Sequence, residues 1–129
     1  MLQAIEEAVS RMEKSVVAIV KGERRYEPVF EALDLVEYKS CLAGYSRVLI
    51  KVNFITTKTW ESGATTDPLV VEAIIRKLKE LPVEIFVVES DATMTNADKA
   101  FEATGMKEMC QQNGVQFLNL RYQKEKVNI

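Results

Sequence analysis

The chain has 129 residues, of which 47% are hydrophobic and 28% are charged, and its formal net charge is -2. This length and composition predict a single globular domain spanning residues 1–129. The mixed charges argue against a nucleic-acid binder, which would carry a clustered basic surplus. The sequence has no histidine, which excludes Ser-His-Asp and Cys-His catalysis and histidine-based zinc sites.

The N-terminal stretch MLQAIEEAVSRMEK lacks the basic and apolar regions of a secretory signal. No apolar run approaches the ~20 residues that a membrane span needs. We therefore expect a cytoplasmic protein with no membrane partner. Cys41 and Cys110 form no CxxC pattern and are expected to be reduced and structural. Two cysteines cannot hold an iron-sulfur cluster alone, so no cofactor is identifiable in the chain.

The first half of the chain predicts two helices around one strand. An amphipathic helix is expected at about residues 2–13, which would be an addition to the domain. The β-branched run Ser15–Val20 is typical of a buried parallel strand. Helical spacing of apolar residues returns from Pro28 to about Tyr38.

The second half continues the alternation of strands with helices. It predicts, in order, a strand at Arg47–Val52, a helix at Pro68–Leu81, a strand at Val83–Ser90, one or two short helices interrupted at Gly105 and closed by Gly114, and a strand at Val115–Leu120. This order predicts an α/β fold, a three-layer sandwich with a mainly parallel sheet of about four strands and helices on both faces.

Ligands of open parallel sheets bind outside the carboxyl ends of the strands. The segment 53–66 follows a strand and is much longer than the ~2–6 residues of most strand-to-helix loops, which favours a functional role. Strand alternation places Lys51 on one face with Leu49 and Asn53. The sequence leaves two interpretations of Lys51. In the first, its side chain extends to solvent and pairs with Glu89 or Asp91. In the second, it points into the cleft, where it holds an anion or transfers a proton.

The helix that follows this loop begins at Asp67-Pro68, which is the expected pair for an N-cap and first helical residue. Gly63, Thr65 and Thr66 precede it, and a second interpretation lets a phosphate or carboxylate approach the helix N-terminus there. The cap alone is the favoured interpretation, because the charge of Asp67 already occupies the positive end of the helix. Glu89-Ser90-Asp91 could hold Mg²⁺, but a solvated strand end is the commoner meaning of such a sequence.

Several motifs resemble the N-terminal half of the domain of unknown function 362 family. They are AIVKGERRYEPVFEAL, VLIKVNF, SGATTDPLVVEAIIRKLKE, VVESDA and AFEATGMKEM with NGVQFLNL, in this order from about residue 17 to 120. The sequence departs from the family's usual lysine-proline-asparagine, because Val52 stands at the proline position. Members are about twice this long, and many are fused to a ferredoxin-type iron-sulfur module with clustered cysteines, which this sequence does not contain.

The resemblance implies a polar edge formed by seven residues: Lys51, Asn53, Gly63, Thr65, Thr66, Asp67 and Glu89. It implies no reaction. The first hypothesis is that this edge binds a small anionic ligand or a metal. The alternative is an interaction module, without catalysis of its own, that docks on a ferredoxin-like or other redox partner. Self-association as a homodimer is a further expectation.

Overall fold

A computed structural model describes residues 15–123. The helix expected at about residues 2–13 lies outside these residues. The described chain has an α/β fold built on a three-stranded parallel sheet in the order β1-β2-β3. Its strands are β1 (Arg47–Lys51), β2 (Glu84–Glu89) and β3 (Gln116–Asn119). All three confirm strands that the sequence predicted.

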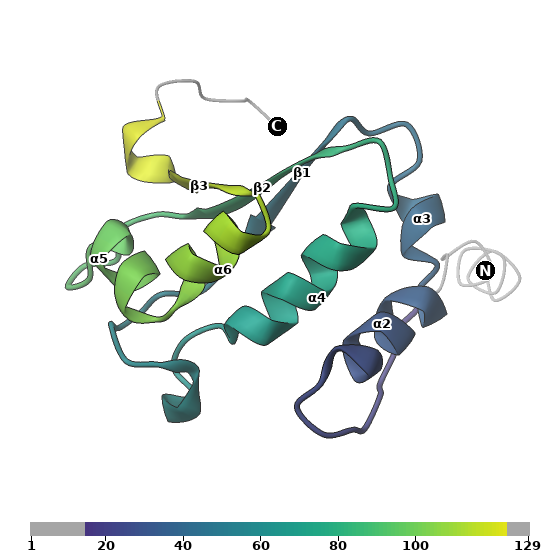
Figure 1. Ribbon diagram of the computed structural model, residues 1–129, viewed down its shortest axis with the longest axis horizontal. Helices are drawn as coiled ribbons and strands as arrows, with labels where there is room; N and C mark the ends of the chain where they lie inside the picture. The colour runs from purple at the N-terminus through teal and green to yellow at the C-terminus, as the bar shows by residue number, and fades with distance from the viewer. Residues whose placement is uncertain (1–14, 124–129) are drawn as a thin grey trace, which may run out of the picture.

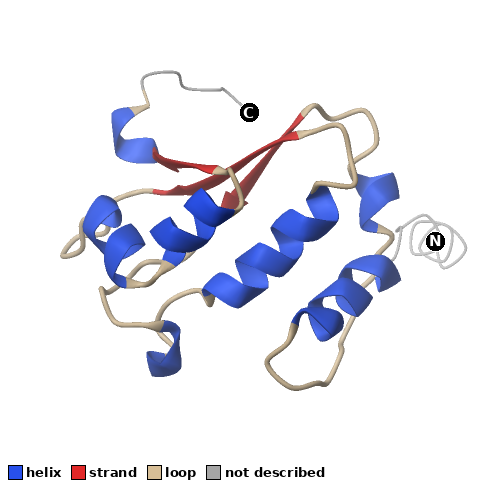
Figure 2. Ribbon diagram, viewed as in Figure 1, coloured by secondary structure: helices blue, strands red, loops and turns tan. Residues whose placement is uncertain are grey.

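Helices connect the strands in the expected order (Figure 1). The α-helices are α2 (Tyr26–Leu35), α3 (Tyr38–Cys41), α4 (Pro68–Leu78), α5 (Ala97–Ala103) and α6 (Met106–Gln112), and two short 3₁₀ helices are η1 (Trp60–Ser62) and η2 (Leu120–Tyr122). Figure 2 shows α4 and α6 together on one side of the strands. The described residues therefore form a helix layer on one side of the sheet, and the expected helix cover on the second face is not found among them.

Helix boundaries follow local chemistry. The segment expected as one helix from Pro28 to Tyr38 is divided into α2 and α3, because Glu37 adopts the left-handed backbone conformation with φ 52. Gly105 separates α5 from α6 as predicted, with φ +79. Helix α4 ends at Leu78, three residues before the predicted end at Leu81.

The core lies between the sheet and the helices α4, α5 and α6. Register aligns Ile50 of β1 with Val87 of β2, and Val87 with Phe117 of β3, so these side chains share the helix-facing side. Val71 and Ile75 of α4 and Met106, Met109 and Cys110 of α6 pack against the same side. The alternation along β1 confirms that Leu49 and Lys51 point to the other face.

One predicted strand is wrong. Ser15–Val20 forms neither strand nor helix, and Val16, Val17 and Ile19 are 72%, 78% and 90% exposed. The composition is that of a buried strand, but a strand needs a neighbouring edge, and the described chain places none beside this segment. The sheet therefore has three strands among residues 15–123 instead of about four.

Candidate functional site

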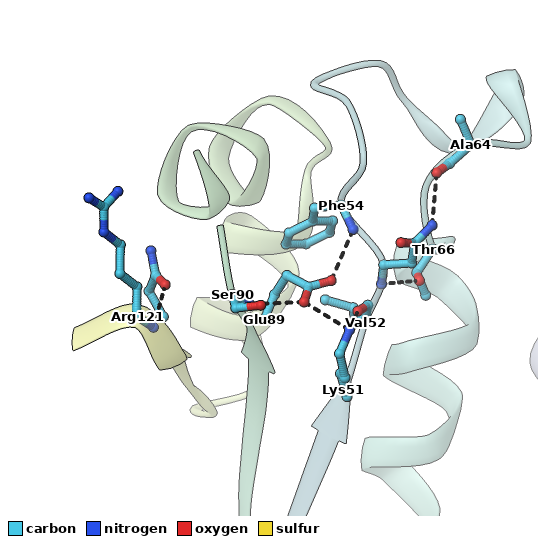
Figure 3. A network of polar contacts seen from close by, with 10 residues as sticks. Lys51, Val52, Phe54, Ala64, Thr66, Glu89, Ser90 and Arg121 are labelled. Carbon is cyan, nitrogen blue, oxygen red and sulfur yellow. Dashed lines mark hydrogen bonds and ion pairs between the residues drawn. The ribbon is translucent and has the colours of Figure 1, made fainter. Parts of the chain in front are cut away.

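The candidate site lies where β1 and β2 end and centres on the buried carboxylate of Glu89 (Figure 3). The Glu89 side chain is only 7% exposed, and three donors surround it. Lys51 Nζ donates to Oε1 at 2.8 Å, the Ser90 amide donates to the same oxygen at 2.8 Å, and the Phe54 amide donates to Oε2 at 3.2 Å. The pairing of Lys51 with Glu89, expected in one of the two alternatives for this lysine, is present, and binding of an anion by the same ammonium stays a prediction.

These contacts decide the charge state of Glu89. Burial by itself raises the pKa of this carboxyl, but the hydrogen bonds from Lys51 and from the Ser90 and Phe54 amides outweigh burial and lower the pKa below its ordinary value. Glu89 is therefore an anion at neutral pH, and both of its oxygens already accept hydrogen bonds.

Lys51 reaches Glu89 from the opposite face of the sheet. Its ammonium also donates to its neighbour's carbonyl, Val52 O, at 2.9 Å, while the side chain stays 61% exposed. An ammonium group has three donors. Two of them are engaged by these acceptors, and the third has no acceptor among residues 15–123.

A cavity of about 170 Å³ lies directly at this ion pair. It is lined by Lys51, Asn53, Phe54, Ile55, Glu89, Ser90, Asp91 and Ala92. Its volume is below the ~300–1,000 Å³ of most small-molecule sites. The cavity therefore has the size of a ligand of a few heavy atoms.

The long loop after β1 is closed by its own hydrogen bonds. At its base the Asn53 amide donates to Thr66 Oγ1 at 2.8 Å, and the Thr66 amide donates to Asn53 O at 3.1 Å. Phe54 and Thr65 form an antiparallel bridge. Inside the loop, Thr65 Oγ1 donates to Lys58 O at 3.0 Å. The two threonine hydroxyls thus hold the loop closed.

The N-terminus of α4 is capped as the sequence predicted. Asp67 Oδ1 accepts from the Leu69 amide at 2.9 Å, and Pro68 occupies the first turn. Arg24 donates to both carboxylate oxygens of Asp67 at 2.8 Å, and its guanidinium lies 4.0 Å from the centre of the Trp60 ring. Asp67 and Arg24 occupy the end of the helix that an anion would use.

The structure therefore divides the seven predicted site residues into two groups. Lys51, Asn53 and Glu89 line the cavity, whereas the other four, Gly63, Thr65, Thr66 and Asp67, shape the loop and the start of α4 behind it. Gly63 has φ +72 and ends η1, where the left-handed conformation favours glycine.

A second polar cluster adjoins the cavity and was not predicted as a whole. Asp91 accepts from the Ala97 amide at 2.9 Å, from Asn119 Nδ2 at 3.0 Å and from Arg121 at 2.5 Å. Together the Ala97 amide, the Arg121 guanidinium and the Asn119 amide lower the pKa of Asp91 to about 2. Asn119 ends β3 and Arg121 follows in η2, so the strand-end rule applied to β3 would have found both.

The two carboxylates of the site are already paired. Residues 15–123 hold no group of three or more His, Cys, Asp or Glu side chains placed to bind a metal ion. Glu89 and Asp91 are each neutralised by a cation and hydrogen-bonded at both oxygens.

Residues 48–129 match the family model described as Domain of unknown function (DUF362). The chain belongs to the DUF362 family. The match begins in β1 and includes the whole cavity, so the candidate site lies within the DUF362 part of the chain. No curated protein and no solved structure matches the chain. Among the described residues of this DUF362 protein, no helix has both the length and the apolar character needed to cross a membrane.

Proposed function

We propose that this DUF362 protein binds a small anion, such as phosphate or a short carboxylate, in the cavity beside Lys51. The observation that carries the proposal is that the cavity lining has an unused hydrogen-bond donor, whereas its carboxylate acceptors are already occupied. Glu89 and Asp91 have their oxygens occupied by donors, while Lys51, which lines the cavity, keeps one donor that has no acceptor among the described residues. A ligand that fits such a lining must accept hydrogen bonds, and an anion accepts them best.

Two further donors support the same class of ligand. Asn53 Nδ2 donates one hydrogen to Ala64 O at 3.1 Å, and an amide nitrogen carries two. Ser90, whose side chain carries a hydroxyl donor, is exposed and lines the cavity. Three hydrogen bonds at about 1–1.5 kcal/mol each correspond to a dissociation constant of about 1 mM, since 1 mM equals about -4.1 kcal/mol.

A divalent metal, the other ligand expected from the sequence, is less well supported. Binding it would require Glu89 to give up Lys51 or Asp91 to give up Arg121, because both carboxylates are already paired. A cytoplasmic location agrees with a phosphate or carboxylate ligand and stays part of the proposal. Docking on an iron-sulfur partner stays a prediction, with no contact among the described residues that favours it.

Thermal unfolding tests the proposal. At ~100 mM phosphate, about 100 times the expected dissociation constant, binding adds about 2.7 kcal/mol. At roughly 3–5 °C per kcal/mol for a domain of this size, this raises Tm by about 8–13 °C. Phosphate also stabilises proteins by exclusion from their surface, so the informative quantity is the difference between variants. We expect Lys51→Met to lose the extra shift and Lys58→Met, which removes an exposed loop ammonium, to keep it. Equal shifts in both variants would refute the proposal.

A further inference from the structure

The segment Ser15–Val20 has the composition of a buried strand but no covering partner within residues 15–123. Val16, Val17 and Ile19 are among the most exposed hydrophobic side chains of the described chain. The backbone of the segment makes no hydrogen bond to other backbone groups within residues 15–123. Six uncharged residues rich in valine and isoleucine are a strong strand former. Such a segment, extended and exposed, is a ready template for pairing with a sheet edge.

The sheet offers a matching edge at β1. Within the described residues β1 pairs only with β2, so its outer edge carries unpaired amides and carbonyls. Leu49, in the middle of β1, is 54% exposed. Its neighbours along that face, Arg47 and Lys51, flank it with charge at the two ends of the strand. An apolar strand added at this edge would cover Leu49 between these charges.

The segment is held away from the β1 edge of its own chain. A Cβ on Gly22 would lie 2.3 Å from Pro28 Cγ, so the turn after the segment packs tightly on the start of α2. Arg24 fixes the same turn to Asp67 and Trp60. Figure 1 shows the purple segment away from β1.

We propose that Ser15–Val20 of each chain adds as a strand to the β1 edge of a second copy, forming a two-fold symmetric dimer. Each chain carries both the segment and the β1 edge. When the segment of one copy pairs with β1 of the second, two-fold symmetry places the segment of the second copy on β1 of the first, and the dimer is closed. Each sheet gains the fourth strand that the sequence predicts. Main-chain hydrogen bonds along the edge supply the affinity, as in other cases of strand addition, and the exposed valine and isoleucine side chains gain cover.

The mass of the full chain in solution is the first test. We expect twice the 14.6 kDa of the monomer by light scattering after size exclusion. Ile19→Asp puts a charge in the added strand and should give a monomer. Met94→Asp is the matched control, because Met94 is 94% exposed in a loop elsewhere, and should leave the dimer intact. A wild-type monomer up to ~1 mM, or equal effects of the two variants, would overturn the proposal.

A disulfide test separates exchange from pairing within one chain. Neighbouring strands lie ~4.8 Å apart, within the range that a disulfide spans. In a Cys41→Ser background, mixing a tagged Ile19→Cys chain with an untagged Leu49→Cys chain should give a disulfide between the two chains. Cys110 can stay, because it is 1% exposed and burial raises the pKa of its thiol to about 11. A third chain carries both Ile19→Cys and Leu49→Cys in the same background. A disulfide inside its monomer, together with no disulfide between the two singly substituted chains, would show pairing within one chain and refute the exchange.

Discussion

Replacing Lys51 with methionine tests the electrostatics of the site, because it removes the ammonium and keeps most of the aliphatic stem. Glu89 would retain the Ser90 and Phe54 amides at 2.8 and 3.2 Å but would lose the cation that is paired with it. A hydrogen bond to a charged group contributes about 1.5–3 kcal/mol. Since the Lys51 side chain is 61% exposed, solvent screening reduces this value, and we expect a loss of about 1–2 kcal/mol in the free energy of unfolding at pH 7.

The loss should depend on pH with a defined sign. In the wild type the pKa of Glu89 is lowered by folding, so its contribution to stability is present above the unfolded pKa of about 4.3 and disappears as the pH falls through the folded value. Without Lys51 the effect of burial is less opposed and the pKa of Glu89 rises. The difference between wild type and Lys51→Met should therefore be largest at pH 7 and shrink below about pH 4.

Urea unfolding at pH 7 and at about pH 3.5 measures the difference in the free energy of unfolding between wild type and Lys51→Met at each pH. Lys58→Met is the control for loss of an exposed ammonium. The reasoning is refuted if Lys51→Met destabilises the protein equally at both pH values, or if it matches Lys58→Met at pH 7.

Three more substitutions probe the surroundings of the cavity. Asp67→Ala removes the cap on the Leu69 amide and should lower the free energy of unfolding by about 0.5–2 kcal/mol in urea titrations; an unchanged value would mean that the cap contributes nothing. Phe54→Ala empties a site that is 2% exposed in the core and should cost about 3–5 kcal/mol in the same assay, whereas a loss below 1 kcal/mol would contradict the packing described. The carboxyl of Asp91, whose pKa is lowered from 3.8 to about 2, contributes stability above its ordinary pKa and loses it as the pH falls toward 2; a carbon-detected NMR titration should find that midpoint, and Arg121→Ala should move it upward.

The parts of the fold that were predictable are those fixed by short-range pattern. The apolar runs of β1, β2 and β3 and the Asp67-Pro68 start of α4 are local signals, and the structure confirms each. The short α5 and α6 were also anticipated, because Gly105 interrupts an otherwise helical pattern.

What the sequence could not predict depends on distant neighbours. Ser15–Val20 has the residues of a strand, but whether it forms one depends on an edge that composition does not reveal. The break before α3 arises at Glu37, a glutamate in a conformation that favours glycine, so no sequence signal marked it.

The candidate site divides in the same way. The strand-end rule located Lys51 and Glu89, because residues at the carboxyl ends of adjacent parallel strands must lie close together. The strand-end rule could not show that the threonine hydroxyls of the long loop form hydrogen bonds with the loop backbone. A threonine looks the same in the sequence whether its hydroxyl is free or hydrogen-bonded.

Binding at the cavity is tested most directly by ¹⁵N–¹H correlation spectra of the full chain during titration with phosphate, and separately with acetate, against sodium chloride at equal ionic strength. We expect saturable shifts, with a dissociation constant of about 1 mM, confined to the amides of residues 53–55 and 89–92 that line the cavity, and their loss in Lys51→Met but not in Lys58→Met. Shifts that are absent, that do not saturate, or that persist in Lys51→Met would contradict the assignment of this cavity as an anion site.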